Sequence, residues 1–282
     1  MESKTFMFIA PKINYMHRNL LKDTKQILES AYELTGIPVE LKEEQSLQYR
    51  AEIIMRKNAE KYILKYHPKY EPELNYLIAH EVGHILRFWQ ATNEERKLPI
   101  SSEKTRKNAI EQLSQELIDM ENKGFPLNLI FELFDLMYLG LVRQVTSMPI
   151  DVRIEEWIYT EFPRLRLDQE MSLRNQIFEA HHALSKEIEN LTPKLIYHAN
   201  NAMNYVFSYF ISSLYDDSKL VEPYIGSCFQ SDGKKLIGHL YNEEDKGYKG
   251  DRKIINKWAQ QLNIQNWFEW LDFQRIECFS VG

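Results

Sequence analysis

Residues 74–88 read LNYLIAHEVGHILRF, and the interpretation of the whole chain starts from this stretch. Apolar residues flank its two histidines without an intervening proline, which predicts a buried helix. His80 and His84 are four positions apart, so on a helix their imidazoles lie on the same face, one turn apart. Gly83 leaves room on that face. We therefore expect the two imidazoles to converge on one metal ion.

Glu81 follows the first histidine directly and lies about 100° further round the helix. Its carboxylate can reach a water on the ion without binding the ion itself. Two neutral nitrogen ligands, an open coordination position and a nearby base are what a zinc-activated water requires. We expect His80 and His84 to bind Zn²⁺ and Glu81 to act as the catalytic base. The alternative is a buried helix whose two histidines only find hydrogen-bond partners.

The pattern His-Glu-x-x-His at positions 80–84 resembles the active-site signature of the zincin metallopeptidases. The strict resemblance covers little more than residues 74–90. It implies a Zn²⁺ cofactor and hydrolysis of peptide bonds in a peptide or protein substrate by a metal-activated water. The longer metzincin form of the signature is excluded, because Arg87, Phe88 and Gln90 occupy the turn that follows.

The competing hypothesis is a catalytically inactive, zincin-like binding or regulatory protein. The intact Glu81 speaks against it, because a protein that has lost catalysis has no need of that base. For the enzyme, an additional donor should stabilise the oxyanion, and Tyr159 and Tyr138 are candidates. A purely structural helical protein with a coincidental motif is the third possibility.

A catalytic zinc site needs a third protein ligand, and residues 147–159 (SMPIDVRIEEWIY) are the most attractive source. Ser147 and Pro149 predict the first turn of a helix. Asp151 and Glu155 lie one turn apart on it, at the margin of the apolar face. A carboxylate at that border is costly unless it is paired or bound to a metal. The third ligand is therefore expected from this pair.

We choose Glu155 as the third ligand and assign Asp151 to orienting a ligand imidazole through its free nitrogen. This makes the chain similar to the gluzincin group, in which the third ligand is a glutamate on a later helix. The chain departs from that group in its long interval after His84 and in the reversed order Asp-x-x-x-Glu. Glu111 and Glu116, on the nearer predicted helix, remain alternatives, as does Asp151 itself.

The periodicity predicts an α+β fold that is mostly helical. A small N-terminal sheet and the His-Glu-x-x-His helix would form a zincin-like core over residues 1–163. A mainly helical C-terminal region, residues 164–282, would pack on that core. Short strands are expected at residues 5–10 and around Lys235–Tyr241.

The segments Ala51–Arg56 and Lys61–His67 predict two strands joined by a four-residue hairpin loop. In zincins, an edge strand above the site pairs with an extended peptide substrate. The resemblance makes Lys61–His67 the candidate for that strand. An ordinary hairpin with a lysine-blunted edge is the alternative.

Composition narrows the class of partners. Of 282 residues, 44% are hydrophobic and 27% are charged, an ordinary globular balance. The net charge of −6 argues against nonspecific binding to nucleic acid or anionic lipid. Cys228 and Cys278 are too few for a disulfide framework, and no uncharged run reaches about eighteen residues. We expect a cytoplasmic protein without a membrane span; nothing in the sequence indicates its oligomeric state.

Overall fold

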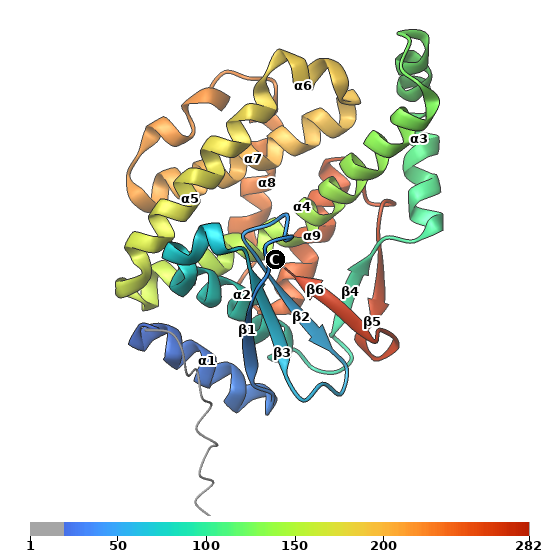
Figure 1. Cartoon of the computed structure of the whole chain (residues 1–282). Helices are drawn as coiled ribbons and strands as arrows, with labels where there is room; N and C mark the ends of the chain where they lie inside the picture. Colours follow the sequence, from blue (N-terminus) through green and yellow to red (C-terminus); the bar gives the residue numbers. More distant parts are fainter. Residues whose placement is uncertain (1–19, 282) are drawn as a thin grey trace, which may run out of the picture.

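The computed structural model describes residues 20–281, so the strand expected at residues 5–10 lies outside the described residues (Figure 1). The predicted mostly helical α+β class is confirmed. The helices are α1 (Lys22–Thr35), α2 (Leu74–Trp89), α3 (Glu103–Asn122), α4 (Leu127–Glu161), α5 (Arg166–His181), α6 (Lys186–Leu191), α7 (Lys194–Tyr215), α8 (Phe229–Asn242) and α9 (Tyr248–Gln261). The strands are β1 (Val39–Glu43), β2 (Ala51–Arg56), β3 (Tyr62–Tyr66), β4 (Lys97–Ile100), β5 (Glu269–Asp272) and β6 (Cys278–Val281).

The main sheet has the strand order β1-β3-β2-β6. The predicted hairpin is confirmed, because β2 and β3 pair in antiparallel register, with Ile53 opposite Leu64. However, β1 pairs in parallel with the other side of β3. Since β3 is hydrogen-bonded on both sides, it has no free edge for a substrate, and the prediction that Lys61–His67 is the substrate-pairing edge strand is wrong.

Two late strands return to the N-terminal part of the molecule. Strand β6 pairs with β2 in antiparallel register and forms an edge of the main sheet. Strand β5 pairs with β4, and together they make a separate two-stranded sheet. Residues 269–281 therefore complete sheets whose other strands lie within the first 100 residues. The division at residue 163 stays a prediction.

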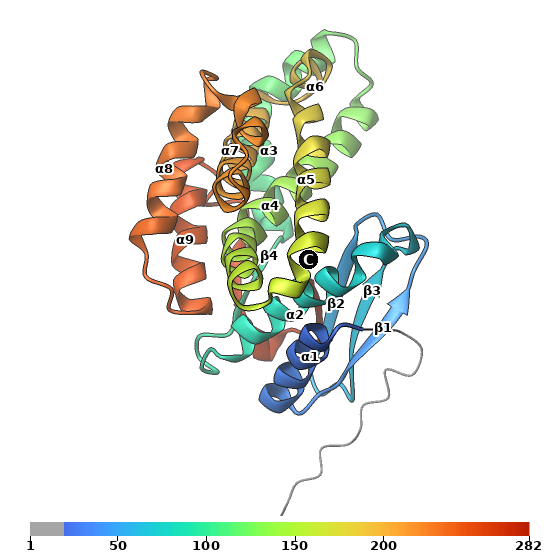
Figure 2. The same cartoon turned by 90° about the vertical axis from the view of Figure 1, so that its left-hand side faces the viewer.

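Helix α2 lies between the main sheet and helix α4 (Figure 2). It is buried on nearly all sides, as its apolar flanks predict. Helix α1 is fixed to its first turn, because Thr24 donates a hydrogen bond to the Asn75 side chain at 2.9 Å. Helix α4 passes so close that a Cβ at Gly83 would lie 2.8 Å from Ile154 Cγ2. Gly83 thus allows the two helices to approach each other.

Two predicted elements differ from the structure. Ser147 and Pro149 do not begin a helix, because α4 runs unbroken from residue 127 to residue 161. A proline inside a helix removes one hydrogen bond, but the buried residues on both sides, Val145 and Ile150 among them, hold the helix together by packing. The strands expected around Lys235–Tyr241 are instead the end of helix α8. Over residues 20–281, no helix is long and apolar enough to cross a membrane.

Candidate metal centre

Helices α2 and α4 bring three potential metal ligands together. His80 and His84 project from α2, and Asp151 projects from the facing turn of α4. The Nε2 atom of His84 lies 3.1 Å from Asp151 Oδ1, and the Nε2 atom of His80 lies 3.8 Å from the same oxygen. Two nitrogens and one oxygen at this spacing match three corners of a tetrahedral zinc site, whose bonds of about 2.0–2.2 Å put neighbouring donors about 3.3 Å apart.

Two of the three donor atoms, those of His84 and Asp151, are fully buried. His84 Nε2 and Asp151 Oδ1 are close together, yet neither takes part in a hydrogen bond within residues 20–281. The buried Oε2 atom of Glu81, on the same helix, is equally without a partner there. Buried polar atoms without partners are costly, and a cation among them removes that cost. The residues present therefore fit a divalent metal ion.

Glu155 lies next to this group but faces the other nitrogen of His80. Its Oε1 atom lies 2.7 Å from His80 Nδ1 and accepts a hydrogen bond of 2.7 Å from the Tyr76 hydroxyl. Its Oε2 atom accepts a hydrogen bond of 2.6 Å from Gln169 Nε2. The carboxylate is completely buried, and both of its oxygens are occupied. This arrangement fixes the His80 ring and directs Nε2 toward Asp151.

The structure thus places the two carboxylates differently from the sequence-based assignment. Asp151, expected to orient an imidazole, lies among the donor atoms, whereas Glu155, expected to bind the metal, orients His80. The alternatives are remote from the group: Glu111 is exposed beside Lys107, and the Glu116 carboxylate accepts a hydrogen bond from the Lys194 backbone. Among the described residues, the geometry favours Asp151 as the third ligand.

The electrostatics of the group follow from its burial. Burial acts to lower the pKa of His80, but its contact with Glu155 outweighs this effect and raises the pKa to about 10. Burial lowers the pKa of His84, which favours its neutral, metal-binding form. Burial also raises the pKa of Glu81 to about 7, although the positive charges of His80 and Arg143 oppose the shift. A carboxylate with such a pKa can exchange a proton near neutral pH.

A polar cavity of about 410 Å³ opens onto the group. It is lined by His80, Glu81 and Asp151 and by two arginines, Arg50 and Arg143. Its wall therefore carries charged side chains and includes two of the three potential ligands together with Glu81; His84 is not part of this lining. The cavity gives a substrate access to the donor atoms and to the candidate base.

The two arginines differ in how their charge is balanced. Arg50 forms ion pairs with Glu73 at 3.3 Å and Glu179 at 2.9 Å. Arg143 is stacked on the Tyr49 ring at 3.6 Å and, within residues 20–281, forms no ion pair with a carboxylate. Its positive charge is therefore available to a bound molecule. Sequence reasoning missed Arg143, although its position two turns before Asp151 on the same apolar helix was a usable signal.

The tyrosines proposed as oxyanion donors do not line this cavity. The Tyr138 hydroxyl is buried between Thr105 and the backbone carbonyl of Trp267, at 2.9 Å from each. Tyr159 packs against the Tyr215 ring and the Arg166 guanidinium. Both side chains therefore have structural partners of their own.

Comparison with known proteins gives no match: no protein-family model, no curated protein and no solved structure matches this chain. The interpretation of the site depends on its own geometry and on the sequence motif.

Proposed function

We propose that this chain is a zinc-dependent metallopeptidase that hydrolyses peptide bonds in a peptide or protein substrate. One observation carries the proposal: three donor atoms, from His80, His84 and Asp151, converge on the helix that also carries the buried, unpartnered Oε2 atom of Glu81. A structural zinc site is usually closed by four protein ligands. Among the described residues this group has three, which suits catalysis because a position stays open for water.

Each side chain has a defined task in this proposal. When bound, Zn²⁺ supplies a Lewis acid that polarises a carbonyl and lowers the pKa of a water molecule. Glu81 accepts the proton from the attacking water and passes it to the leaving amine. Glu155 holds the proton on Nδ1 of His80, so Nε2 is the nitrogen that releases its proton and binds the metal.

Arg143 is the candidate for stabilising negative charge on the substrate. Its guanidinium lines the cavity that contains Glu81 and lacks a carboxylate partner within the described residues. A fixed cation beside a carbonyl that becomes an oxyanion contributes more to catalysis than one that must reorient. Arg143 replaces Tyr138 and Tyr159 in this role.

The test compares Glu81→Gln with Glu156→Gln, a neighbouring control whose carboxylate is exposed on α4. Both variants should retain about one equivalent of zinc by elemental analysis. Glu81→Gln should lose about 10²- to 10⁴-fold of its rate of peptide cleavage, measured by mass spectrometry on a peptide library. The control should cleave normally. Unchanged cleavage by Glu81→Gln would refute the role of this residue.

A further inference from the structure

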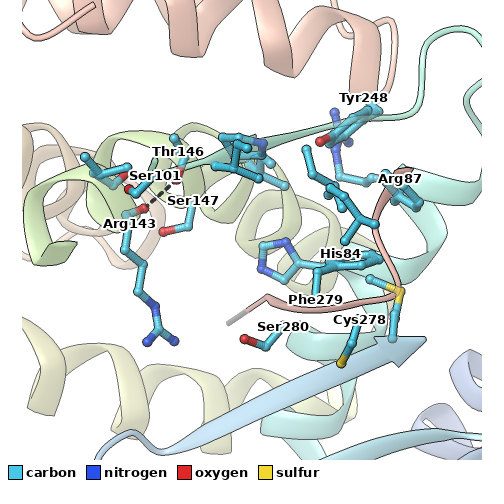
Figure 3. A pocket seen from close by; sticks show the side chains of 18 of the residues that line it. His84, Arg87, Ser101, Arg143, Thr146, Ser147, Tyr248, Cys278, Phe279 and Ser280 are labelled. Atoms are coloured by element: carbon cyan, nitrogen blue, oxygen red, sulfur yellow. Dashed lines mark hydrogen bonds between the residues drawn. The ribbon is translucent and has the colours of Figure 1, made fainter. Parts of the chain in front are cut away.

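A second cavity, distinct in its chemistry from the first, begins at His84 and has a volume of about 340 Å³. Figure 3 shows His84 between the α4 side chains Ser147 and Arg143 and the strand β6. Cavities of roughly 300–1,000 Å³ are typical of sites that bind small molecules or parts of larger ligands. This cavity is therefore large enough for a bulky side chain.

The walls of the cavity are mainly apolar and come from several separate elements. Strands β2, β4 and β6 and helices α2 and α4 contribute Met55, Phe88, Leu98, Leu139, Val142 and Phe279. An apolar group that enters leaves water for a hydrocarbon environment, which is favourable by about 25 cal/mol for each Å² buried. The composition of the walls thus favours an apolar occupant.

The polar groups at the far end of the cavity already have partners. Arg87 is bound by Asp251 and Asp245, with its Nη2 atom 2.7 Å from a carboxylate oxygen of each. The Tyr248 hydroxyl donates a hydrogen bond to the Lys97 carbonyl. A charged side chain that reached this end would lose its hydration without gaining an ion pair. The far end of the cavity is therefore unsuited to acidic or basic side chains.

The apolar cavity shares residues with the candidate metal centre and with the polar cavity. His84, one of the proposed ligands, forms part of its wall. Arg143 lines both this cavity and the polar one. The apolar cavity therefore lies directly beside the metal centre, where it is next to a molecule bound there.

We propose that this cavity binds a large apolar side chain of the substrate, adjacent to the peptide bond that is cleaved. The proposal rests on the proposed peptidase function and adds the substrate class: peptides with a residue such as Phe or Leu beside the scissile bond. A hydrophobic pocket of this kind discriminates by roughly 10- to 200-fold between side chains that fill it and smaller ones.

The experiment measures binding apart from turnover. The full chain carrying Glu81→Gln is loaded with zinc and titrated calorimetrically with N-acetyl-phenylalaninamide and N-acetyl-alaninamide. The first probe should bind at least about tenfold more tightly, because only it fills the cavity. In parallel, the unsubstituted chain is given a peptide library that varies one position, and cleavage should concentrate beside Phe and Leu.

Leu139→Trp tests whether the binding occurs in this cavity. Leu139 lines the cavity and is 53% exposed, so a larger side chain there narrows the cavity without disturbing the core. Leu136→Trp is the matched control, because Leu136 lies one turn away on α4, is 70% exposed and is not part of the lining. Leu139→Trp should reduce the preference for the phenylalanine probe to less than about threefold, and the control should retain it.

The outcomes separate the two proposals. Equal affinity for both probes, or a preference that Leu139→Trp leaves intact, overturns the assignment of the cavity. Cleavage without a preference for apolar residues also overturns it, while supporting the peptidase function. The third outcome is that the phenylalanine probe binds selectively, that Leu139→Trp removes this selectivity, and that no peptide is cleaved. This outcome supports the cavity assignment and counts against the peptidase function.

Discussion

Replacing Glu155 by glutamine should weaken zinc binding without removing a zinc ligand. The carboxylate holds His80 through Nδ1 and also accepts hydrogen bonds from Tyr76 and Gln169. A glutamine amide cannot satisfy all three groups, because one of its ends is a donor. If its NH₂ faces His80, the imidazole must carry its proton on Nε2, which blocks metal binding. If its NH₂ faces Gln169, two buried donors oppose each other.

The size of the effect follows from this geometry. A buried donor without an acceptor costs about 1–3 kcal/mol. Loss of the residue that orients a ligand histidine typically reduces metal affinity by about 10- to 100-fold. This range corresponds to about 1.4–2.7 kcal/mol, so the two estimates agree. Asp151→Asn removes a charged donor from the group itself, and its loss of affinity should exceed about 100-fold.

The assay is a competition titration for Zn²⁺ against a chromophoric chelator, with the unsubstituted chain, Glu155→Gln and Asp151→Asn measured at the same pH. The expected order of affinity is the unsubstituted chain, then Glu155→Gln, then Asp151→Asn. Circular dichroism should show that all three proteins are folded. The reverse order of the two variants would refute the roles derived from the structure and restore Glu155 as the third ligand.

Three further predictions concern packing, a buried ion pair and pH. Gly83→Ala should destabilise the protein by about 1–2 kcal/mol in urea denaturation, because the new methyl group would lie 2.8 Å from Ile154 on α4. Gly140→Ala is the control: a methyl group there would have no atom within 4 Å, and it should stabilise the protein by up to about 1 kcal/mol. Arg87→Met should lower the free energy of unfolding by about 3–5 kcal/mol in the same assay, because Asp251 is 1% exposed and would lose its partner. A second substitution, Asp251→Asn, should recover part of this stability. Equal stability of the single and double variants would contradict the reasoning. Burial raises the pKa of Glu81 to about 7, and only the ionised carboxylate accepts a proton. The value of kcat/KM should therefore decline as the pH falls through 7, or through a lower pH if the bound cation lowers this pKa. A rate that rises on acidification would contradict the role of Glu81 as the base.

The fold class could be predicted because long apolar periodicities report helices directly. The order of strands could not, because pairing partners depend on which distant segments meet. The pattern of β3 is the same for an edge strand as for an interior one, and only the parallel pairing of β1 with β3 decides between them. For a related reason, the sequence did not indicate that α4 continues through Pro149. Tertiary packing on both sides of the proline outweighs its local tendency to end a helix.

The motif residues of the candidate site could be identified from their spacing alone, because His80, Glu81 and His84 belong to one helix. The roles of Asp151 and Glu155 could not be distinguished in this way, because both lie at the margin of the same buried face. Their roles depend on how α4 crosses α2, which is set by the close approach at Gly83. That crossing is a property of two helices distant in the sequence.

The most direct test of the account is a crystal structure of the zinc-loaded full chain with anomalous diffraction measured at the zinc absorption edge. We predict one strong peak, about 2.0–2.2 Å from Nε2 of His80, Nε2 of His84 and a carboxylate oxygen of Asp151. Density without a zinc peak at these atoms, or a peak bonded to Glu155 in place of Asp151, would contradict the proposed metal centre.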